Sequence, residues 1–167
     1  MKIPGVELRK VDAPSDARGR FTEIYRASRS QEKLVQANHS RSKAGVVRGL
    51  HYHRHQADLW YVVRGTARVG LVDLRSRVDP PPAETVDLTE EEPATLFIPP
   101  GVAHGFAALT DVDLVYWVTA EYDASDEYGI AWDDPAIALD WGVDDPILSD
   151  RDSSNPSLSW HDIPRFS

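Results

Sequence analysis

Cysteine is absent from this sequence of 167 residues, and no long run of apolar residues occurs in it. Without cysteine, disulfide bonds and thiol chemistry are excluded. A membrane-spanning helix needs about 20 consecutive apolar residues, so we expect no membrane partner. Basic residues are also scarce, because 18 lysines and arginines stand against 27 acidic residues and leave a net charge of −9. Nucleic-acid-binding domains normally present a basic surface, so we expect no nucleic-acid partner either.

The remaining composition is typical of a soluble globular domain, with 41% hydrophobic and 27% charged residues. The chain is long enough to bury a substantial core in one domain. Its first ten residues contain no apolar stretch of the kind found in secretory signals, so a cytoplasmic location is expected. We predict a single domain over residues 1–167, with N-terminal strands in 1–39, a core barrel over about 40–122 and a C-terminal extension over 123–167.

Short segments rich in β-branched and aromatic residues recur along the chain, separated by glycine and proline turns. Segments 59–63 and 67–74 predict the two arms of a β-hairpin that turns at Gly65. The other predicted strands are 6–8, 20–25, 85–88, 95–99 and 114–119, with one more in DDPAIALDW at 133–141. Helical periodicity is weak, so the pattern predicts an all-β fold, an antiparallel jelly-roll barrel. Beyond residue 123, the Asp-, Pro- and Trp-rich sequence predicts loops and short helical turns packed against this barrel.

Two histidine-containing segments are the main candidates for a functional site. Residues 49–65, GLHYHRHQADLWYVVRG, have the spacing H-x-H-x4-D-x6-G, and IPPGVAHGF further on contains P-x-G-x2-H. Residues two apart on a strand face the same side, so His51 and His53 are both expected to point into the barrel. With Asp58 and His104 they would provide four ligands for a divalent metal ion. The alternative interpretation is that the histidines bond one another or water and that Asp58 caps a turn.

These two motifs resemble the signature motifs of the cupin superfamily, whose first motif usually has Glu where this chain has Asp58. A second resemblance covers about residues 3–160, in which ordered segments are similar to those of the dTDP-4-dehydrorhamnose 3,5-epimerase family. The segments are DARGRFTE at 16–23, QANHS at 36–40, RGLHY at 48–52, RGTARVGLVDLR at 64–75, IPPGVAHGF at 98–106, YWVTAEY at 116–122, EYGIAWDDP at 127–135 and LSDRD at 148–152. The resemblance implies a cupin-type jelly-roll fold, a homodimer, no metal or other cofactor, and a nucleotide-diphosphate sugar as partner.

The resemblance also implies an isomerase of deoxysugar biosynthesis that acts on a dTDP-4-keto-6-deoxyhexose. A proton next to the ketone, at C3 and/or C5, would be removed and returned on the opposite face. His51 would be the base, Asp152 its orienting partner and Tyr116 the acid. The implied substrate-binding residues are Arg48 and Arg151 at the diphosphate, His104 near the sugar, and Arg18, Phe21 and Glu23 at the nucleotide, reached across the dimer interface. The structural alternatives are a core tyrosine at 116, a turn cap at Asp152 and a surface pair of Arg18 with Glu23.

Two residues depart from the family pattern. After RGLHY the family usually has Gln and, further on, a lysine that steadies the enolate, whereas this chain has His53 and Asp58. A carboxylate beside a developing enolate opposes its charge, by on the order of several kcal/mol in a water-poor site. Three hypotheses therefore stay open. They are an epimerase, a metal-dependent enzyme with His51, His53, Asp58 and His104 as ligands, and a sugar-nucleotide-binding relative without catalysis.

Overall fold

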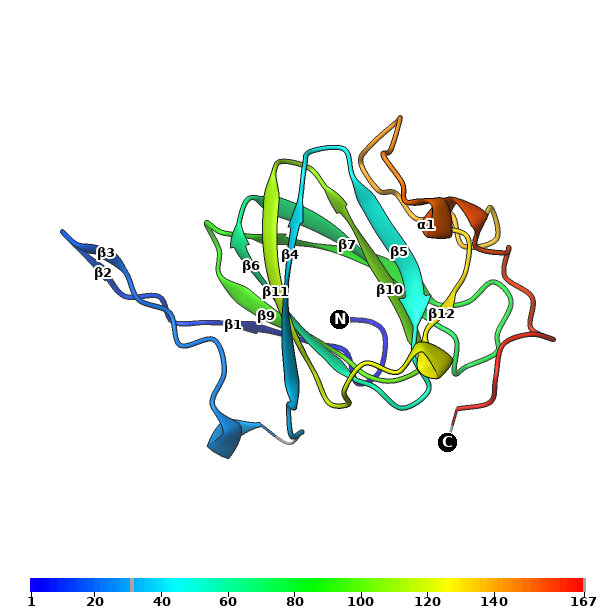
Figure 1. Cartoon of the computed structure of the whole chain (residues 1–167), viewed down its shortest axis with the longest axis horizontal. Helices are drawn as coiled ribbons and strands as arrows, with labels where there is room; N and C mark the ends of the chain where they lie inside the picture. The colour runs from blue at the N-terminus through cyan, green and yellow to red at the C-terminus, as the bar shows by residue number, and fades with distance from the viewer. Residues whose placement is uncertain (31, 167) are drawn as a thin grey trace.

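The computed structural model describes residues 1–30 and 32–166, and its main strands form two five-stranded antiparallel sheets (Figure 1). The first sheet has the order β1 (Glu7–Lys10), β9 (Ala94–Ile98), β6 (Asp58–Arg64), β11 (Val112–Val118) and β4 (Gln36–Ser42). The second has the order β12 (Tyr128–Gly129), β5 (Val47–Tyr52), β10 (Val102–Ala108), β7 (Thr66–Asp73) and β8 (Ala83–Thr89). The predicted all-β, antiparallel architecture is therefore confirmed.

Side-chain alternation along the second sheet divides the core into two layers, because neighbouring residues of a strand face opposite sides. On β7, Val69 belongs to the cluster inside the barrel, together with Trp60 of the first sheet. Val72 belongs to a second cluster, together with Trp141 of the C-terminal extension. The extension therefore covers the outer face of the second sheet, as predicted. It contains the short helix α1 (Asp150–Ser154) and lies beside β5 and β12 (Figure 1).

The hairpin predicted at Gly65 is wrong, although both of its strands are present. β6 pairs with β9 and β11 in the first sheet, whereas β7 pairs with β8 and β10 in the second. Gly65, at φ 83°, forms the turn that carries the chain from one sheet to the other. An added Cβ there would lie 2.0 Å from the carbonyl oxygen of Asp111, so this turn requires glycine.

Two other predicted strands are not observed. The segment 20–25 contributes only its first residue, Arg20, to β3 (Gly19–Arg20), which pairs with β2 (Ser15–Asp16) in a small projecting hairpin. Residues 133–141 form turns, because Ile137 and Trp141 are buried against the second sheet instead of pairing with a strand. Two 3₁₀ turns, Ala27–Arg29 and Ala124–Asp126, complete the described elements. Within the described residues, no helix is long and apolar enough to cross a membrane.

Gly105→Ala is expected to destabilise the barrel, because β5 and β10 approach closely at this residue. An added Cβ would lie 2.4 Å from the carbonyl oxygen of Arg48 and 2.9 Å from the Cα of Gly49. These are backbone atoms, so relief requires the two strands to separate. We expect the free energy of unfolding to fall by about 1–3 kcal/mol, measured by urea denaturation. An unchanged denaturation midpoint would show that the strands separate without cost.

Candidate active site

A cavity of about 500 Å³ lies within the barrel and is lined from both sheets and from the C-terminal extension. β4 contributes alternate residues, Gln36, Asn38 and Ser40, which face one side because of the strand period of two. His39, between them, faces away and lies 2.9 Å from Asp113 through its Nε2. The cavity is polar as well as concave, which is typical of a site that binds a hydrophilic small molecule.

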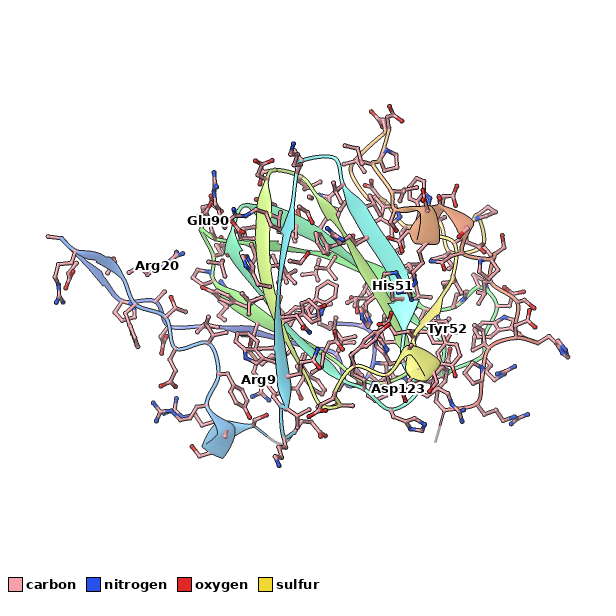
Figure 2. The ribbon with its side chains drawn as sticks, in the orientation of Figure 1. Arg9, Arg20, His51, Tyr52, Glu90 and Asp123 are labelled. Carbon is pink, nitrogen blue, oxygen red and sulfur yellow. The ribbon has the colours of Figure 1, made fainter. Side chains whose placement is uncertain are left out.

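His51 and Asp152 form a hydrogen-bonded pair at the wall of this cavity. His51 lies near the end of β5 (Figure 2), and Asp152 is carried by α1, whose first turn is capped by the side chain of Ser149. The Nε2 of His51 lies 2.6 Å from Oδ1 of the buried Asp152. A carboxylate only accepts, so Nε2 carries the proton and Nδ1 keeps its lone pair.

Asp152 is ionised in this pair. Burial by itself raises the pKa of its carboxyl group. The hydrogen bond from His51, together with hydrogen bonds from Ser149 and the backbone of Gly49, outweighs burial and lowers that pKa below its usual value. The buried carboxylate therefore carries a negative charge next to the imidazole of His51.

Tyr116 lines the same cavity from the other sheet, on β11. Its phenol is half-buried. Burial, followed by the negative charges of Asp58 and Glu127, raises the pKa of Tyr116 above its usual value. At neutral pH the phenol therefore holds its proton and is able to donate it.

Two arginines bring positive charge to the cavity of an otherwise acidic protein. Arg48 donates from Nε to the hydroxyl of Ser42 at 3.0 Å. Arg151, on α1, lies 2.5 Å from the carboxylate of Glu127 and keeps about half of its side chain exposed, at 47%. Guanidinium groups placed in this way are suited to bind phosphate oxygens.

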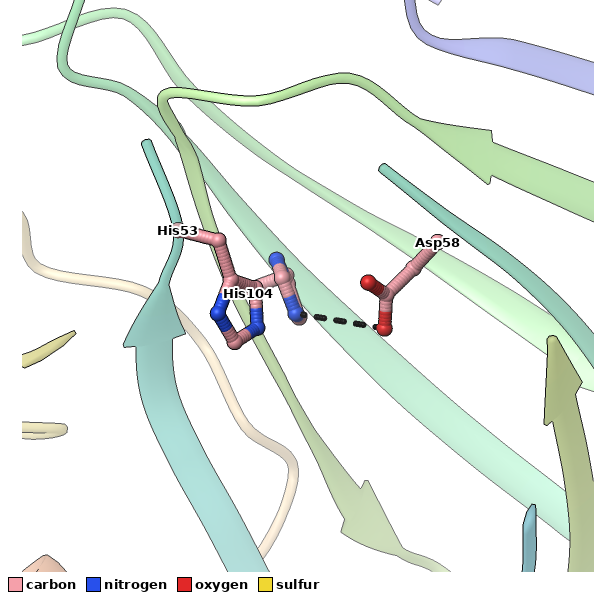
Figure 3. A group of neighbouring side chains, drawn as sticks. All are labelled: His53, Asp58 and His104. Atoms are coloured by element: carbon pink, nitrogen blue, oxygen red, sulfur yellow. Dashed lines mark ion pairs between the residues drawn. The ribbon is translucent and has the colours of Figure 1, made fainter. Parts of the chain in front are cut away.

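His53, Asp58 and His104 form a second, buried group in the cavity wall (Figure 3). One ligand atom from each lies within 4.8 Å of those of the other two, and His104 Nε2 lies 3.8 Å from Asp58 Oδ2. Burial lowers the pKa of His104 to about 4. The structure therefore groups three of the four predicted metal ligands. The fourth, His51, is bonded to Asp152 and lies outside this group.

Comparison with known proteins shows the family of this chain. A family model described as dTDP-4-dehydrorhamnose 3,5-epimerase matches residues 1–159. The chain belongs to this family. The prediction made from the ordered motifs, of an isomerase-type enzyme family, is therefore confirmed.

Three relatives show how far the likeness extends. A dTDP-4-dehydrorhamnose 3,5-epimerase of Methanothermobacter thermautotrophicus is 40% identical, with 90% of this chain and 88% of that protein covered. The spore coat polysaccharide biosynthesis protein SpsL of Bacillus subtilis is 39% identical, with 85% and 98% covered. The crystal structure of dTDP-6-deoxy-D-glucose-3,5-epimerase from Legionella pneumophila, in complex with dTDP-4-keto-L-rhamnose, superposes with a TM-score of 0.90. It is 30% identical, with 100% of this chain and 96% of that one covered.

In this member of the epimerase family, three predicted substrate-binding residues lie away from the cavity. Arg18, Phe21 and Glu23 belong to the N-terminal segment, whose hairpin β2–β3 projects from the barrel (Figure 1), and none of them lines the cavity. Arg18 pairs with Asp16, and Glu23 is bonded to Arg26, so the alternative of an Arg18–Glu23 surface pair is wrong. Phe21 is 73% exposed.

Sequence reasoning missed several residues of the cavity. Trp60 donates from Nε1 to Asp58 Oδ2 at 3.0 Å, and Gln56 donates to Asp58 Oδ1 at 2.9 Å. The period of two was the available signal for Trp60, which follows Asp58 by two residues on β6. Tyr122 and Glu127 also line the cavity, from the segment that follows β11. Both lie within segments that carry the family resemblance, YWVTAEY and EYGIAWDDP, but no regular periodicity singled them out as cavity residues.

Proposed function

We propose that this chain epimerises a dTDP-4-keto-6-deoxyhexose at C3 and/or C5 through an enolate. Membership of the family supports the substrate class, and the related Legionella enzyme is described in complex with a sugar nucleotide of this kind. The observation that carries the proposal is that one cavity is lined by a carboxylate-bound histidine and by a protonated tyrosine from the opposite sheet. These are the two partners that inversion at a carbon requires.

His51 acts as the base. Its Nε2 is bonded to Asp152, so Nδ1 is the nitrogen that takes the proton from the carbon next to the ketone. The resulting imidazolium is stabilised by the ionised Asp152 beside it, which is largely buried and so little screened by solvent. The hydrogen bond thereby orients the imidazole of His51 without placing Asp152 against the substrate.

Tyr116 acts as the acid. It comes from β11 in the first sheet, whereas His51 comes from β5 in the second. A sugar bound between them therefore has His51 on one face of its ring and Tyr116 on the other. A proton returned by Tyr116 reaches the carbon on the face opposite to the one that His51 deprotonated. The configuration is thereby inverted, and these two proton transfers use side chains alone.

The diphosphate is held by Arg48 and Arg151, with His104 next to the sugar. The ion pair with Glu127 holds the guanidinium of Arg151 in place before substrate arrives. Arg18, Phe21 and Glu23 contact the nucleotide from the partner in a homodimer. This part of the proposal is supported by the exposed Phe21 and by the hairpin that projects from its own barrel (Figure 1).

The test is exchange of substrate hydrogen with solvent. A dTDP-4-keto-6-deoxyglucose incubated with the protein in D₂O is expected to gain deuterium at C3, C5 or both, which proton NMR measures position by position. dTDP-glucose serves as the control, since without a ketone it has no acidic carbon position and should gain none. If the keto sugar binds tightly and remains unlabelled, the chain is a sugar-nucleotide-binding relative without catalysis.

A further inference from the structure

We propose that His53, Asp58 and His104 bind a divalent transition-metal ion in the wall of the cavity. His53 directly follows β5, Asp58 begins β6 and His104 lies within β10, so the group is built from both sheets. All three are buried, and one ligand atom from each lies within 4.8 Å of those of the others (Figure 3).

Both histidines direct a lone pair away from the backbone. The Nδ1 of His53 lies 2.8 Å from the carbonyl oxygen of Asp126, and the Nδ1 of His104 lies 2.9 Å from that of Val102. A carbonyl only accepts, so each Nδ1 carries the proton. In the neutral imidazole, Nε2 is then the atom free to bind a metal. Metal-binding histidines are commonly oriented by such a bond from the second ring nitrogen.

Asp58 is oriented in the same way. Gln56 donates to Oδ1 at 2.9 Å, and the indole of Trp60 donates to Oδ2 at 3.0 Å. Each carboxylate oxygen has two lone pairs, so both retain one for a further partner. Hydrogen bonds thus hold all three side chains in place and still leave each with a lone pair that can bind a metal ion.

The contact between His104 and Asp58 is not a direct hydrogen bond. Its 3.8 Å separation from Nε2 to Oδ2 is longer than a hydrogen bond, and it brings an imidazole lone pair toward a buried carboxylate. Two acceptor atoms placed side by side in a buried site repel each other. A metal ion bound by both atoms would replace this repulsion with attraction.

Two imidazole nitrogens and one carboxylate oxygen are ligands for Zn²⁺, Mn²⁺, Fe²⁺, Co²⁺ or Ni²⁺, whereas Ca²⁺ and Mg²⁺ prefer oxygen ligands throughout. Three protein ligands leave a coordination position for water or substrate. A cation here offsets the charge of Asp58, which by itself opposes an enolate in this cavity. That role rests on the proposed function, but the binding of metal does not.

Metal content tests the proposal. Protein without an affinity tag, purified without chelators, is measured by inductively coupled plasma mass spectrometry as wild type, Asp58→Asn and His53→Gln. The matched controls are His51→Asn, in the same cavity, and His55→Ala, an exposed histidine two residues after His53. We expect close to one metal per chain in the wild type and both controls, and a clearly lower metal content in the other two variants, because loss of a ligand lowers affinity by at least about tenfold.

A second measurement guards against variants that fold poorly. Wild-type protein stripped with a chelator is titrated with Zn²⁺ by calorimetry, and thermal unfolding is followed with and without the ion. One binding event per chain and a higher unfolding temperature are expected, because binding to the folded state stabilises it. Absence of binding in the wild type, or equal affinity in Asp58→Asn, overturns the proposal. Loss of metal in His51→Asn overturns the three-residue site, since His51 would then be a ligand.

The two proposals fail separately. Bound metal without deuterium exchange leaves the metal site standing and contradicts the epimerase. Exchange by protein that binds no metal leaves the epimerase standing and contradicts the metal site.

Discussion

His51→Asn is expected to lower the rate of deuterium exchange into the keto sugar by at least about a hundredfold. Asparagine is smaller than histidine and polar, and its amide cannot accept a proton at neutral pH. The carbon next to the ketone then has no base, so both exchange and epimerisation stop. The readout is deuterium incorporation by NMR, with circular dichroism to confirm that the variant is folded.

His39→Asn is the matched control for this loss. His39 lies on β4 but on the face away from the cavity, where its Nε2 is 2.9 Å from Asp113. Exchange by this variant should equal that of the wild type. If His51→Asn also exchanges at the wild-type rate, the base is another residue, and His53 and His104 are the remaining histidines of the cavity.

Tyr116→Phe is expected to slow epimerisation by about 10²- to 10⁴-fold and to leave much of the exchange intact. The phenyl ring fills the same space without the proton that must be delivered on the second face. His51 still removes a proton and returns one from solvent to the same face, so labelling continues with retention of configuration. The ratio of exchange to epimerisation, measured in one NMR experiment, should therefore rise sharply.

The control is Tyr61→Phe, a buried tyrosine on β6 that does not line the cavity. This variant should keep the wild-type ratio. Equal loss of exchange and epimerisation in Tyr116→Phe would contradict the assignment of Tyr116 as the acid, because both rates would then depend on it in one step.

The pH dependence follows from the direction of the shift at Tyr116. Its pKa is raised above the usual value of 10.0, so the donating, protonated form persists to higher pH than in a free tyrosine. Loss of the Tyr116 proton is therefore not expected to slow epimerisation between pH 8 and about 10. Any decline of the rate in this range should also occur in Tyr116→Phe. A decline in this range that disappears in the variant would indicate that Tyr116 loses its proton earlier.

Most strands could be predicted because the residue types that favour a strand occur within the strand itself. The β-branched and aromatic residues of β6 and β7 mark both strands, whatever they pair with. Pairing is a property of the whole barrel, which is why the hairpin at Gly65 was wrong. The strand predicted over 133–141 was wrong for a related reason. Ile137 and Trp141 are apolar because they pack against the second sheet, and their hydrophobicity does not require a strand.

The sequence by itself determined which residues are available and which faces of the strands they occupy. The spacing of His51 and His53 is enough to place both on the cavity side, because strand side chains alternate. The partner of His51 was implied only by resemblance, since Asp152 lies 101 residues further along the chain and reaches it through α1.

Only the tertiary structure decided how the histidines divide. Asp152 takes Nε2 of His51, while the backbone carbonyls of Asp126 and Val102 take Nδ1 of His53 and His104. One histidine thereby pairs with Asp152, and the other two form a separate group with Asp58. The spacing of the histidines in the sequence does not predict this division. It depends on where carboxylates and carbonyls that are distant in the sequence lie in the folded barrel.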